Sequence, residues 1–235
     1  MTSSSGRLAI VPARGGSKGV ADKNLRLLAG RTLLDYAAGA ARESQVVDRI
    51  VLSTDSEEIA AAGREAGLDV PFMRPAALAQ DDTAMLPVIV HALAELARTG
   101  WAPEYVMLLQ PTSPLRRGSH IAAALSQLTT SGADSVVTVV EVPRHLSPDY
   151  VMRIEGGVLR PFLPGGARVT RRQDARPAYS RDGTVYAFRR DTVERFGDIY
   201  GDRCLPLVID SEESLSIDSQ ADWDRAERIL SAWES

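Results

Sequence analysis

The stretch Leu8-Ala9-Ile10-Val11 is followed directly by Pro12-Ala13-Arg14-Gly15-Gly16-Ser17-Lys18-Gly19, and Lys23-Asn24 closes the segment. The apolar run is short and stops at a proline, which is typical of a buried strand. In the segment that follows the apolar run, glycines let the main chain approach an anion, while arginine and lysine supply cationic hydrogen-bond donors. The stretch therefore predicts a strand that ends in an anion-binding loop.

Outside this stretch, short runs rich in Val, Ile and Leu alternate with amphipathic segments of helical length. Such alternation is typical of strand-helix-strand crossovers in an α/β domain with a mainly parallel sheet. Strands are expected at Leu8–Val11, Ile50–Ser53, Tyr105–Leu109, Ser135–Val140, Val185–Phe188 and Leu207–Ile209. Helices are expected at Leu33–Glu43, Glu57–Ala66, Leu86–Arg98, Ile121–Leu128 and Gln220–Trp233.

The loops after the expected strands are the place to look for a site. In open α/β sheets, ligands bind outside the carboxyl ends of the strands. Here these loops begin at Pro12, Thr54, Gln110 and Glu141, and all of them carry polar or turn-forming residues. We therefore expect the functional residues where these loops meet.

One segment breaks the alternation of strands and helices. Residues 143–182 are rich in Pro, Gly and Arg and show no strong helical period. A connection of this length is too long for a simple loop in a compact domain. The chain is therefore interpreted as a single domain, 1–235, with an inserted hairpin arm at 143–182.

Composition and charge limit the classes of partner. The 27 basic and 31 acidic residues give a formal net charge of -4, so a protein-wide basic field for nucleic acid is absent. The first apolar run is too short for a signal peptide or a membrane span. Cys204 is the only cysteine, which suits a reducing compartment. We expect a soluble, cytoplasmic protein that binds neither nucleic acid nor a membrane.

The glycine-rich segment differs from two common nucleotide-binding motifs. A P-loop needs Gly-Lys-Ser or Gly-Lys-Thr in that order, and the dinucleotide fingerprint has a different glycine spacing. Neither pattern occurs between Pro12 and Gly19. The segment therefore gives no support for an ATPase or a dehydrogenase function.

Several short blocks follow one another along the chain: Arg14–Gly19, Lys23-Asn24, Leu28–Gly30, Ser53–Asp55, Arg74–Thr83, Leu109–Arg116, Arg171–Asp174 and Ser216–Asp218. In this order they resemble the acylneuraminate cytidylyltransferases, also called CMP-sialic acid synthetases. The blocks span nearly the whole chain, so the resemblance is more specific than any single loop. It implies a three-layer, Rossmann-like nucleotidyltransferase domain with a mostly parallel sheet and a small dimerisation arm.

The resemblance also implies a reaction. CMP would pass from CTP to the anomeric hydroxyl of a nine-carbon 3-deoxy-ulosonic acid of the sialic acid type, and pyrophosphate would be released. Mg²⁺ is the implied cofactor, and a homodimer built through the arm is the implied assembly.

The same resemblance assigns roles to individual residues. The catalytic residues would be Arg14, Lys23 and Asp218, and Asp218 would also hold the metal. The nucleotide-binding residues would be Ala13, Arg14, Gly15, Gly16, Ser17, Lys18, Lys23, Asn24, Arg74 and Asp82. The acceptor-binding residues would be Gln110, Thr112, Ser113, Arg172 and Gln173.

Local structure offers other roles for some of these residues. The glycine-rich loop fits a flexible turn with solvated cations, and the segment Gln110–Arg116 fits a proline-stiffened turn with Ser113 or Ser119 as the cap of the next helix. The arginines of the arm fit a solvated face. Asp218 fits a helix cap, although Ser219 with Asp222 is the more natural one.

The acids after the second expected strand are interpreted as structural. Asp55 with Glu58 fits a capping arrangement at the start of a helix.

The sequence departs from the family pattern at two places. Ser216 stands where the family has an aspartate, so weaker Mg²⁺ binding is expected. Tyr179-Ser180-Arg181-Asp182-Gly183 also differs, on the acceptor side. The acceptor therefore stays open among sialic, legionaminic, pseudaminic and deaminated sugar acids and a phosphonic acid, and a non-catalytic nucleotide-binding protein is the alternative from another class.

Overall fold

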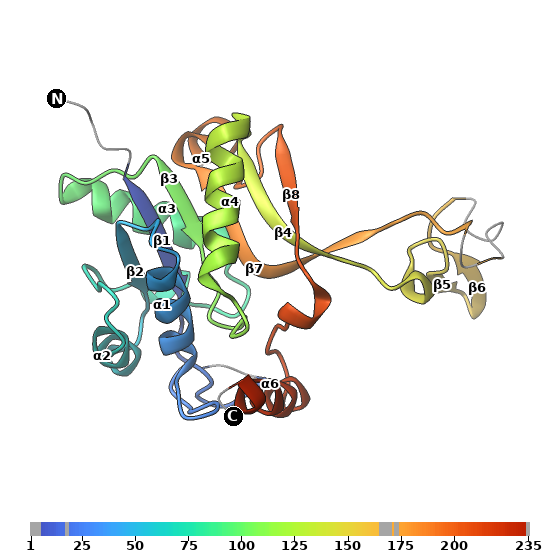
Figure 1. Ribbon diagram of the computed structural model, residues 1–235, viewed down its shortest axis with the longest axis horizontal. Helices are drawn as coiled ribbons and strands as arrows, with labels where there is room; N and C mark the ends of the chain where they lie inside the picture. Colours follow the sequence, from blue (N-terminus) through green and yellow to red (C-terminus); the bar gives the residue numbers. More distant parts are fainter. Residues whose placement is uncertain (1–5, 17–18, 165–170, 172–173, 234–235) are drawn as a thin grey trace.

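The computed structural model describes residues 6–16, 19–164, 171 and 174–233, and its centre is a six-stranded sheet (Figure 1). The strands are β1 (Arg7–Pro12), β2 (Arg49–Ser53), β3 (Tyr105–Leu108), β4 (Ser135–Glu141), β7 (Tyr179–Arg189) and β8 (Cys204–Val208), in the order β2-β1-β3-β7-β4-β8. β7 is antiparallel to both neighbours, and the other strands are parallel to one another. The predicted α/β fold with a mostly parallel sheet is confirmed.

The helices are α1 (Leu33–Glu43), α2 (Glu57–Glu65), α3 (Met85–Arg98), α4 (Gly118–Ser131), α5 (Arg190–Phe196) and α6 (Gln220–Trp233), with short 3₁₀ helices at Ala76–Leu78, Arg144–Leu146 and Ser211–Glu213. All of the predicted helices are confirmed. The sequence pattern does not predict α5, because this helix has only 7 residues and no apolar period to reveal it. The predicted α1 begins at Leu33 because Thr32 and Asp35 form a reciprocal capping box.

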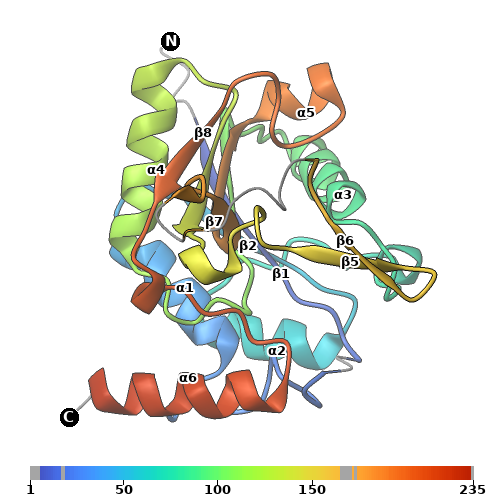
Figure 2. The same cartoon turned by 90° about the vertical axis from the view of Figure 1, so that its right-hand side faces the viewer.

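Helices cover both faces of the sheet (Figure 2). On one face, Ala9 and Val11 of β1 pack with α1, α2 and α4. On the other face, Leu8 and Ile10 pack with α3, and α5 adds Val193. Successive side chains of a strand point to opposite faces, so this one strand supplies both layers of the core.

A third core cluster lies at the carboxyl edge of the sheet. Trp223 of α6 is fully buried among Leu28, Leu33, Leu115 and Ile217. These apolar side chains come from three loops, the first residue of α1 and the C-terminal helix. The cluster therefore holds the segment before α6 against the loops that follow β1 and β3.

The predicted arm contains an antiparallel hairpin of β5 (Met152–Glu155) and β6 (Val158–Pro161). Its turn residues Gly156 and Gly157 have φ angles of 59° and 79°, which a two-residue hairpin of the primed type needs. The hairpin stands well away from the six-stranded sheet, and the ends of β4 and β7 lead out to it (Figure 1). Among the described residues, none of the helices has the length and apolar character needed to cross a membrane.

Gly118 tests the contact between α1 and the start of α4. A Cβ at this position would lie 2.5 Å from the main-chain nitrogen of Ser44, so the two helices can approach only at a glycine. Gly118→Ala should lower the free energy of unfolding by about 1–3 kcal/mol, as overpacking typically does. Urea denaturation followed by circular dichroism measures it.

Gly39→Ala is the matched control. Gly39 lies within α1, and a Cβ there meets nothing within 4 Å. This change should raise the free energy of unfolding by about 0.5–1 kcal/mol, because alanine restricts the unfolded chain and favours a helix. Equal effects of the two substitutions would contradict the packing described here.

Candidate active site

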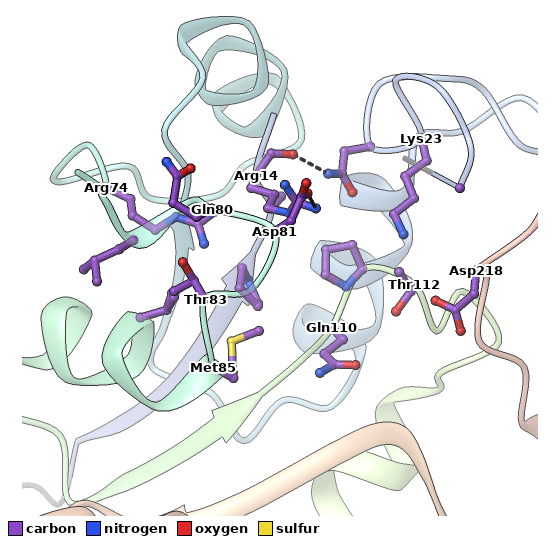
Figure 3. Close-up of a pocket in the computed structure, with 17 residues that line it drawn as sticks. Arg14, Lys23, Arg74, Gln80, Asp81, Thr83, Met85, Gln110, Thr112 and Asp218 are labelled. Carbon is purple, nitrogen blue, oxygen red and sulfur yellow. Dashed lines mark hydrogen bonds and ion pairs between the residues drawn. The ribbon is translucent and has the colours of Figure 1, made fainter. Parts of the chain in front are cut away.

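A cavity of about 380 Å³ opens at the carboxyl ends of β1 and β3 (Figure 3). This is the edge of the sheet where the sequence predicts a site. The lining residues are Pro12, Ala13, Arg14, Gly19, Lys23, Asn24, Arg74, Leu78, Gln80, Asp81, Thr83, Met85, Val88, Gln110, Pro111, Thr112 and Asp218. Three of these are cationic and two are carboxylates, so the described lining is suited to an anion that carries its own counterion.

Arg14 lies at the start of the loop after β1. The Asn24 side-chain amide donates to the Arg14 carbonyl at 3.2 Å, which ties the two ends of the glycine-rich loop together. The Arg14 guanidinium is paired with Asp81, with 2.5 Å between Nη2 and Oδ1. Both side chains are partly exposed, so a phosphate entering the cavity can take the place of Asp81 at low cost.

Asp55 is not a helix cap. The side chain of Ser56 caps α2 by accepting a hydrogen bond from the Ile59 amide at 3.3 Å, so the predicted pairing of Asp55 with Glu58 is wrong. The Asp55 carboxylate instead accepts from the Gly15 amide at 3.1 Å. It also lies 3.8 Å from the Arg74 guanidinium. Asp55 therefore connects the glycine-rich loop to Arg74.

Arg74 is a buried cation beside the cavity. Burial lowers the pKa of its guanidinium, Asp55 raises that pKa, and Arg14 lowers it. Its Nε and Nη2 atoms are buried and have no hydrogen-bond partner in the described part of the chain. Buried donors of this kind are costly unless something accepts from them, so this side of the cavity is suited to a ligand with hydrogen-bond acceptors.

Lys23 and Asp218 form the opposite side of the cavity (Figure 3). The Lys23 ammonium donates to the Ile217 carbonyl at 3.3 Å, and the Ile217 amide donates to the Thr112 carbonyl at 2.8 Å. Gly19 lies so close that a Cβ there would be 2.0 Å from the Asp218 carbonyl oxygen. Three segments far apart in the sequence therefore converge on this side.

The carboxylate of Asp218 is not used as a helix cap. The amides of Asp218 and Ser219 donate to the Asp222 carboxylate at 3.2 Å and 2.8 Å, and the Ser219 hydroxyl accepts from the Asp222 amide. The predicted cap of Ser219 with Asp222 is confirmed. The Asp218 carboxylate accepts from the Ser216 hydroxyl at 3.3 Å and lines the cavity.

Most of the predicted nucleotide-binding residues lie together. Ala13, Arg14, Lys23, Asn24 and Arg74 line the main cavity. Gly15 and Gly16 line a smaller one of about 140 Å³ that shares Arg14 and Asn24. Ser17 and Lys18 lie outside the described residues.

Asp82 is exposed and lines neither of these two cavities. Its neighbour Asp81 faces the main cavity instead, and the sequence could not choose between two adjacent aspartates. Thr83 and Met85, which sequence reasoning did not select, line the cavity as well.

The predicted acceptor residues separate into three groups. Gln110 and Thr112 line the cavity. Ser113 is buried, and its hydroxyl has no hydrogen-bond partner within the described residues. Arg172 and Gln173 lie outside the described residues.

An open α/β sheet with cations and an aspartate around a cavity at its carboxyl edge defines a class of protein that handles nucleoside polyphosphates.

The chain belongs to the cytidylyltransferase family, whose model matches residues 8–220. It is 32% identical over 226 residues to a CMP-N,N'-diacetyllegionaminic acid synthase of Legionella pneumophila, with 95% of both chains covered. It is also 32% identical over 218 residues to an N-acylneuraminate cytidylyltransferase of Streptococcus agalactiae, which covers 92% of this chain and 51% of that protein. The chain therefore spans about half the length of the streptococcal relative.

The fold is similar to a solved structure of CMP:2-keto-3-deoxy-manno-octonic acid synthetase complexed with CTP. The TM-score is 0.73 at 16% identity, with 98% of this chain and all of the other covered. The predicted membership of a family related to the acylneuraminate cytidylyltransferases is confirmed, and the protein is a nucleotidyltransferase.

The pKa of Lys23 tests the electrostatics of the cavity without any ligand. Burial lowers this pKa, Asp218 raises it, and Arg14 lowers it. Lys18 and Lys23 are the only lysines in the chain, so labelling with ¹³C-lysine gives two side-chain signals, and Lys23→Gln assigns them. NMR titration should place Lys23 below its ordinary value of 10.5, and Asp218→Asn should lower it further.

The sign of the effect on binding follows from this shift. The ammonium loses its charge as the pH rises through a lowered pKa, so affinity for anions should fall at a lower pH than an ordinary lysine would allow. A Lys23 signal that titrates at or above the ordinary value, or that moves upward in Asp218→Asn, would contradict the description of this side of the cavity.

Proposed function

We propose that the protein transfers CMP from CTP to the anomeric hydroxyl of a nine-carbon 3-deoxy-ulosonic acid of the sialic acid type and releases pyrophosphate. The observation that carries the proposal is the cavity in which Arg14, Lys23 and Asp218 lie around one edge of the sheet. The relatives named above, which are synthases and transferases of CMP-activated acidic sugars, support the choice of acceptor.

The Arg74 side of the cavity is proposed to bind the base and ribose. Cytosine presents carbonyl and ring-nitrogen acceptors, and Arg74 carries buried donors that have no hydrogen-bond partner among the described residues. Leu78, Met85 and Val88 give the same region apolar walls. A few fixed polar groups within apolar walls are the usual way in which a protein recognises a base.

Arg14 and Lys23 are proposed to bind the triphosphate. Negative charge grows on the leaving pyrophosphate as the bond at the α-phosphorus breaks. Cations that are already in place stabilise this charge without reorganisation of solvent, and this is commonly the largest catalytic term. The hydrogen bond from Lys23 to the Ile217 carbonyl holds the ammonium on this side of the cavity before substrate arrives.

Asp218 is proposed to hold Mg²⁺ together with the phosphates. Within the described residues, no group of three or more His, Cys, Asp or Glu side chains could form a protein-only metal cage. Mg²⁺ is commonly held by one or two carboxylates plus substrate phosphates and water, so one aspartate beside a triphosphate site fits this ion. When bound, the ion neutralises phosphate charge. Ser216 offers only a hydroxyl here, so weaker Mg²⁺ affinity than with a second carboxylate is expected.

The proposed chemical step is a direct displacement. The anomeric oxygen of the acceptor bonds to the α-phosphorus, the bond from that phosphorus to the pyrophosphate breaks in line, and the hydroxyl proton is released. The cavity lining within the described residues includes no histidine or glutamate. Positioning and charge stabilisation are therefore expected to supply most of the rate enhancement.

Gln110 and Thr112 are proposed to contact the acceptor, because they line the cavity next to Asp218. Arg172 is proposed to pair with the acceptor carboxylate, since a planar guanidinium can hold both oxygens. Ser113, which is buried, is proposed to hold this loop in place.

Legionaminic acid is the second candidate acceptor. The Legionella relative aligns with 95% of its own length, whereas the streptococcal relative aligns with 51% at the same identity. Sialic and legionaminic acids share the carboxylate and the anomeric hydroxyl, so the mechanism above holds for either.

Pyrophosphate release tests the proposed reaction. The protein is incubated with Mg²⁺, each of the four ribonucleoside triphosphates, and a panel of sialic, legionaminic, pseudaminic and deaminated sugar acids and simple phosphonates. Release with CTP and one sugar acid is expected. Release with a phosphonate alone would exclude the sugar acid. No pyrophosphate release with any acceptor, despite CTP binding, would favour a non-catalytic protein.

Asp218→Asn refines the same assay. Turnover should fall by about 100-fold or more, because a metal contributes several kcal/mol of charge stabilisation at the reacting phosphate. Asp224→Asn, which removes an exposed carboxylate from α6, is the matched control and should leave turnover unchanged. Near-normal turnover of Asp218→Asn would remove Asp218 from the mechanism.

The arm is proposed to dock on a second copy of the chain. Ile154 and Leu159 lie opposite each other across the hairpin and are 76% and 61% exposed. Leu146 and Phe162 are also more than half exposed. Large apolar side chains that are exposed side by side, as Ile154 and Leu159 are, fit an interface better than a solvated surface.

Sedimentation equilibrium tests the dimer. The wild-type protein should show twice the chain mass of 25.4 kDa, and the double variant Ile154→Ser, Leu159→Ser should shift toward the monomer. Leu27→Ser replaces an equally exposed leucine outside the arm and should remain dimeric. A monomeric wild type, or a double variant that stays dimeric, would contradict the proposed interface.

A further inference from the structure

β7 carries a bulge next to the cavity. Tyr186 pairs with Val137 of β4 and Arg181 pairs with Val139, so the segment Asp182–Val185 lies opposite the single residue Thr138. The Thr138 hydroxyl accepts from the Val185 amide at 2.8 Å and donates to the Val185 carbonyl at 3.1 Å. The bulge is thus stabilised by a side chain in place of regular ladder bonds, and such bulges often lie beside active sites.

The bulge packs closely against the loop that follows β3. Gly183 has a φ of +84°, and a Cβ there would lie 3.2 Å from Gln110 Oε1 and 3.4 Å from Ser113 Oγ. The positive φ strains any residue except glycine, and a Cβ at these distances would require the Gln110 side chain to shift slightly. The position of the Gln110 side chain is therefore limited by the bulge.

Arg116 joins the loop to the bulge. Its Nε donates to the Thr184 carbonyl at 2.6 Å, and its Nη2 donates to the Gln110 carbonyl at 2.5 Å. The side chain is buried, with 6% of the residue exposed. One rigid guanidinium therefore fixes the distance between two main-chain segments that are far apart in the sequence.

This arrangement is costly for the fold. Burial lowers the pKa of the Arg116 guanidinium to about 9, although Asp182 raises it. Its Nη1 is buried and lacks a hydrogen-bond partner in the described part of the chain. An apolar side chain of similar length is usually tolerated as well as a buried ion, so stability alone does not explain an arginine here.

We propose that Arg116 is a positioning residue that sets the affinity for the acceptor by holding the Gln110–Ser113 loop against the bulge of β7. Arg116 need not touch either substrate; it acts through the main chain of Gln110, whose side chain lines the cavity. The nucleotide contacts proposed above lie on other loops and meet this loop only through the hydrogen bond from the Ile217 amide to the Thr112 carbonyl, so the clamp should affect the acceptor more than CTP. The inference rests on the proposed acceptor contacts of Gln110.

Arg116→Met is the first test. Methionine replaces the unbranched stem of the arginine side chain and removes the charged guanidinium group, so the fold should persist. The KM for the acceptor should rise roughly 10-fold to 100-fold, as small displacements of positioning groups do, while the KM for CTP stays within about twofold of the wild-type value in the same assay. Arg116→Lys should raise the KM for the acceptor nearly as much as Arg116→Met, because a single ammonium cannot hold both carbonyls in the guanidinium geometry.

Arg117→Met is the matched control. Arg117 is the next residue on the same loop, but its side chain is 47% exposed and pairs with Glu213. It should leave both KM values unchanged. Gly183→Ala approaches the same loop from the bulge and should reproduce the effect of Arg116→Met on the acceptor.

Hydrogen exchange measured by mass spectrometry supplies a second readout. Arg116→Met should raise amide exchange in peptides covering 106–117 and 179–187 and leave the peptides of β1 and β2 unchanged. Unchanged exchange in both segments, or an equal rise in the KM for CTP and acceptor, would overturn the positioning role. If the wild type turns over no acceptor in the panel, the proposed function fails, and the exchange measurement alone decides the role of Arg116.

Discussion

The close approach of the loop after β1 to the segment before α6 holds the site together. Gly19 lies against the Asp218 carbonyl, Lys23 donates to the Ile217 carbonyl, and Ile217 itself is fully buried. The core around Trp223 lies beneath these contacts. Because the segments come from opposite ends of the chain, the cation and the aspartate can face one cavity only when the whole sheet has formed.

The electrostatic pattern of the site explains several unusual groups. Arg74 and Arg116 are buried guanidinium groups whose pKa values are lowered by burial, and each has at least one nitrogen without a hydrogen-bond partner in the described part of the chain. Arg74 borders the cavity, where a ligand can accept from it, whereas Arg116 braces the main chain. Burying a guanidinium destabilises the fold at both positions, and in return Arg74 serves ligand binding directly and Arg116 serves it by positioning a loop.

Much of the fold could be predicted from the sequence, because the parallel strands and their covering helices leave a regular alternation of apolar runs and amphipathic segments. The long β7 was harder to recognise. Its first half, from Tyr179 to Asp182, is polar or exposed and has no strand pattern, and a bulge interrupts the pairing that follows. The direction of β7 depends on the return of the chain from the arm, which local sequence does not encode.

The site could be predicted in part. Arg14, Lys23 and Asp218 line one cavity, because they lie in segments that follow β1 and β8, which have a common direction, and Arg74 reaches the same cavity from the segment between α2 and α3. The sequence predicts Asp55 as a helix cap, but its partner Gly15 lies 40 residues away, and Ser56 supplies the local cap instead. Arg116 and Gly183 were missed as a pair for the same reason: their contact depends on tertiary structure.

Isothermal titration with CTP and CMP in the presence of Mg²⁺ tests most directly the claim that Lys23 and Asp218 form a triphosphate site. Wild-type protein should bind CTP roughly 10-fold or more tightly than CMP, because each hydrogen bond to a charged group contributes about 1.5–3 kcal/mol. Lys23→Gln should remove most of this difference. Equal affinities for CTP and CMP, or a preference that survives in Lys23→Gln, would contradict the account.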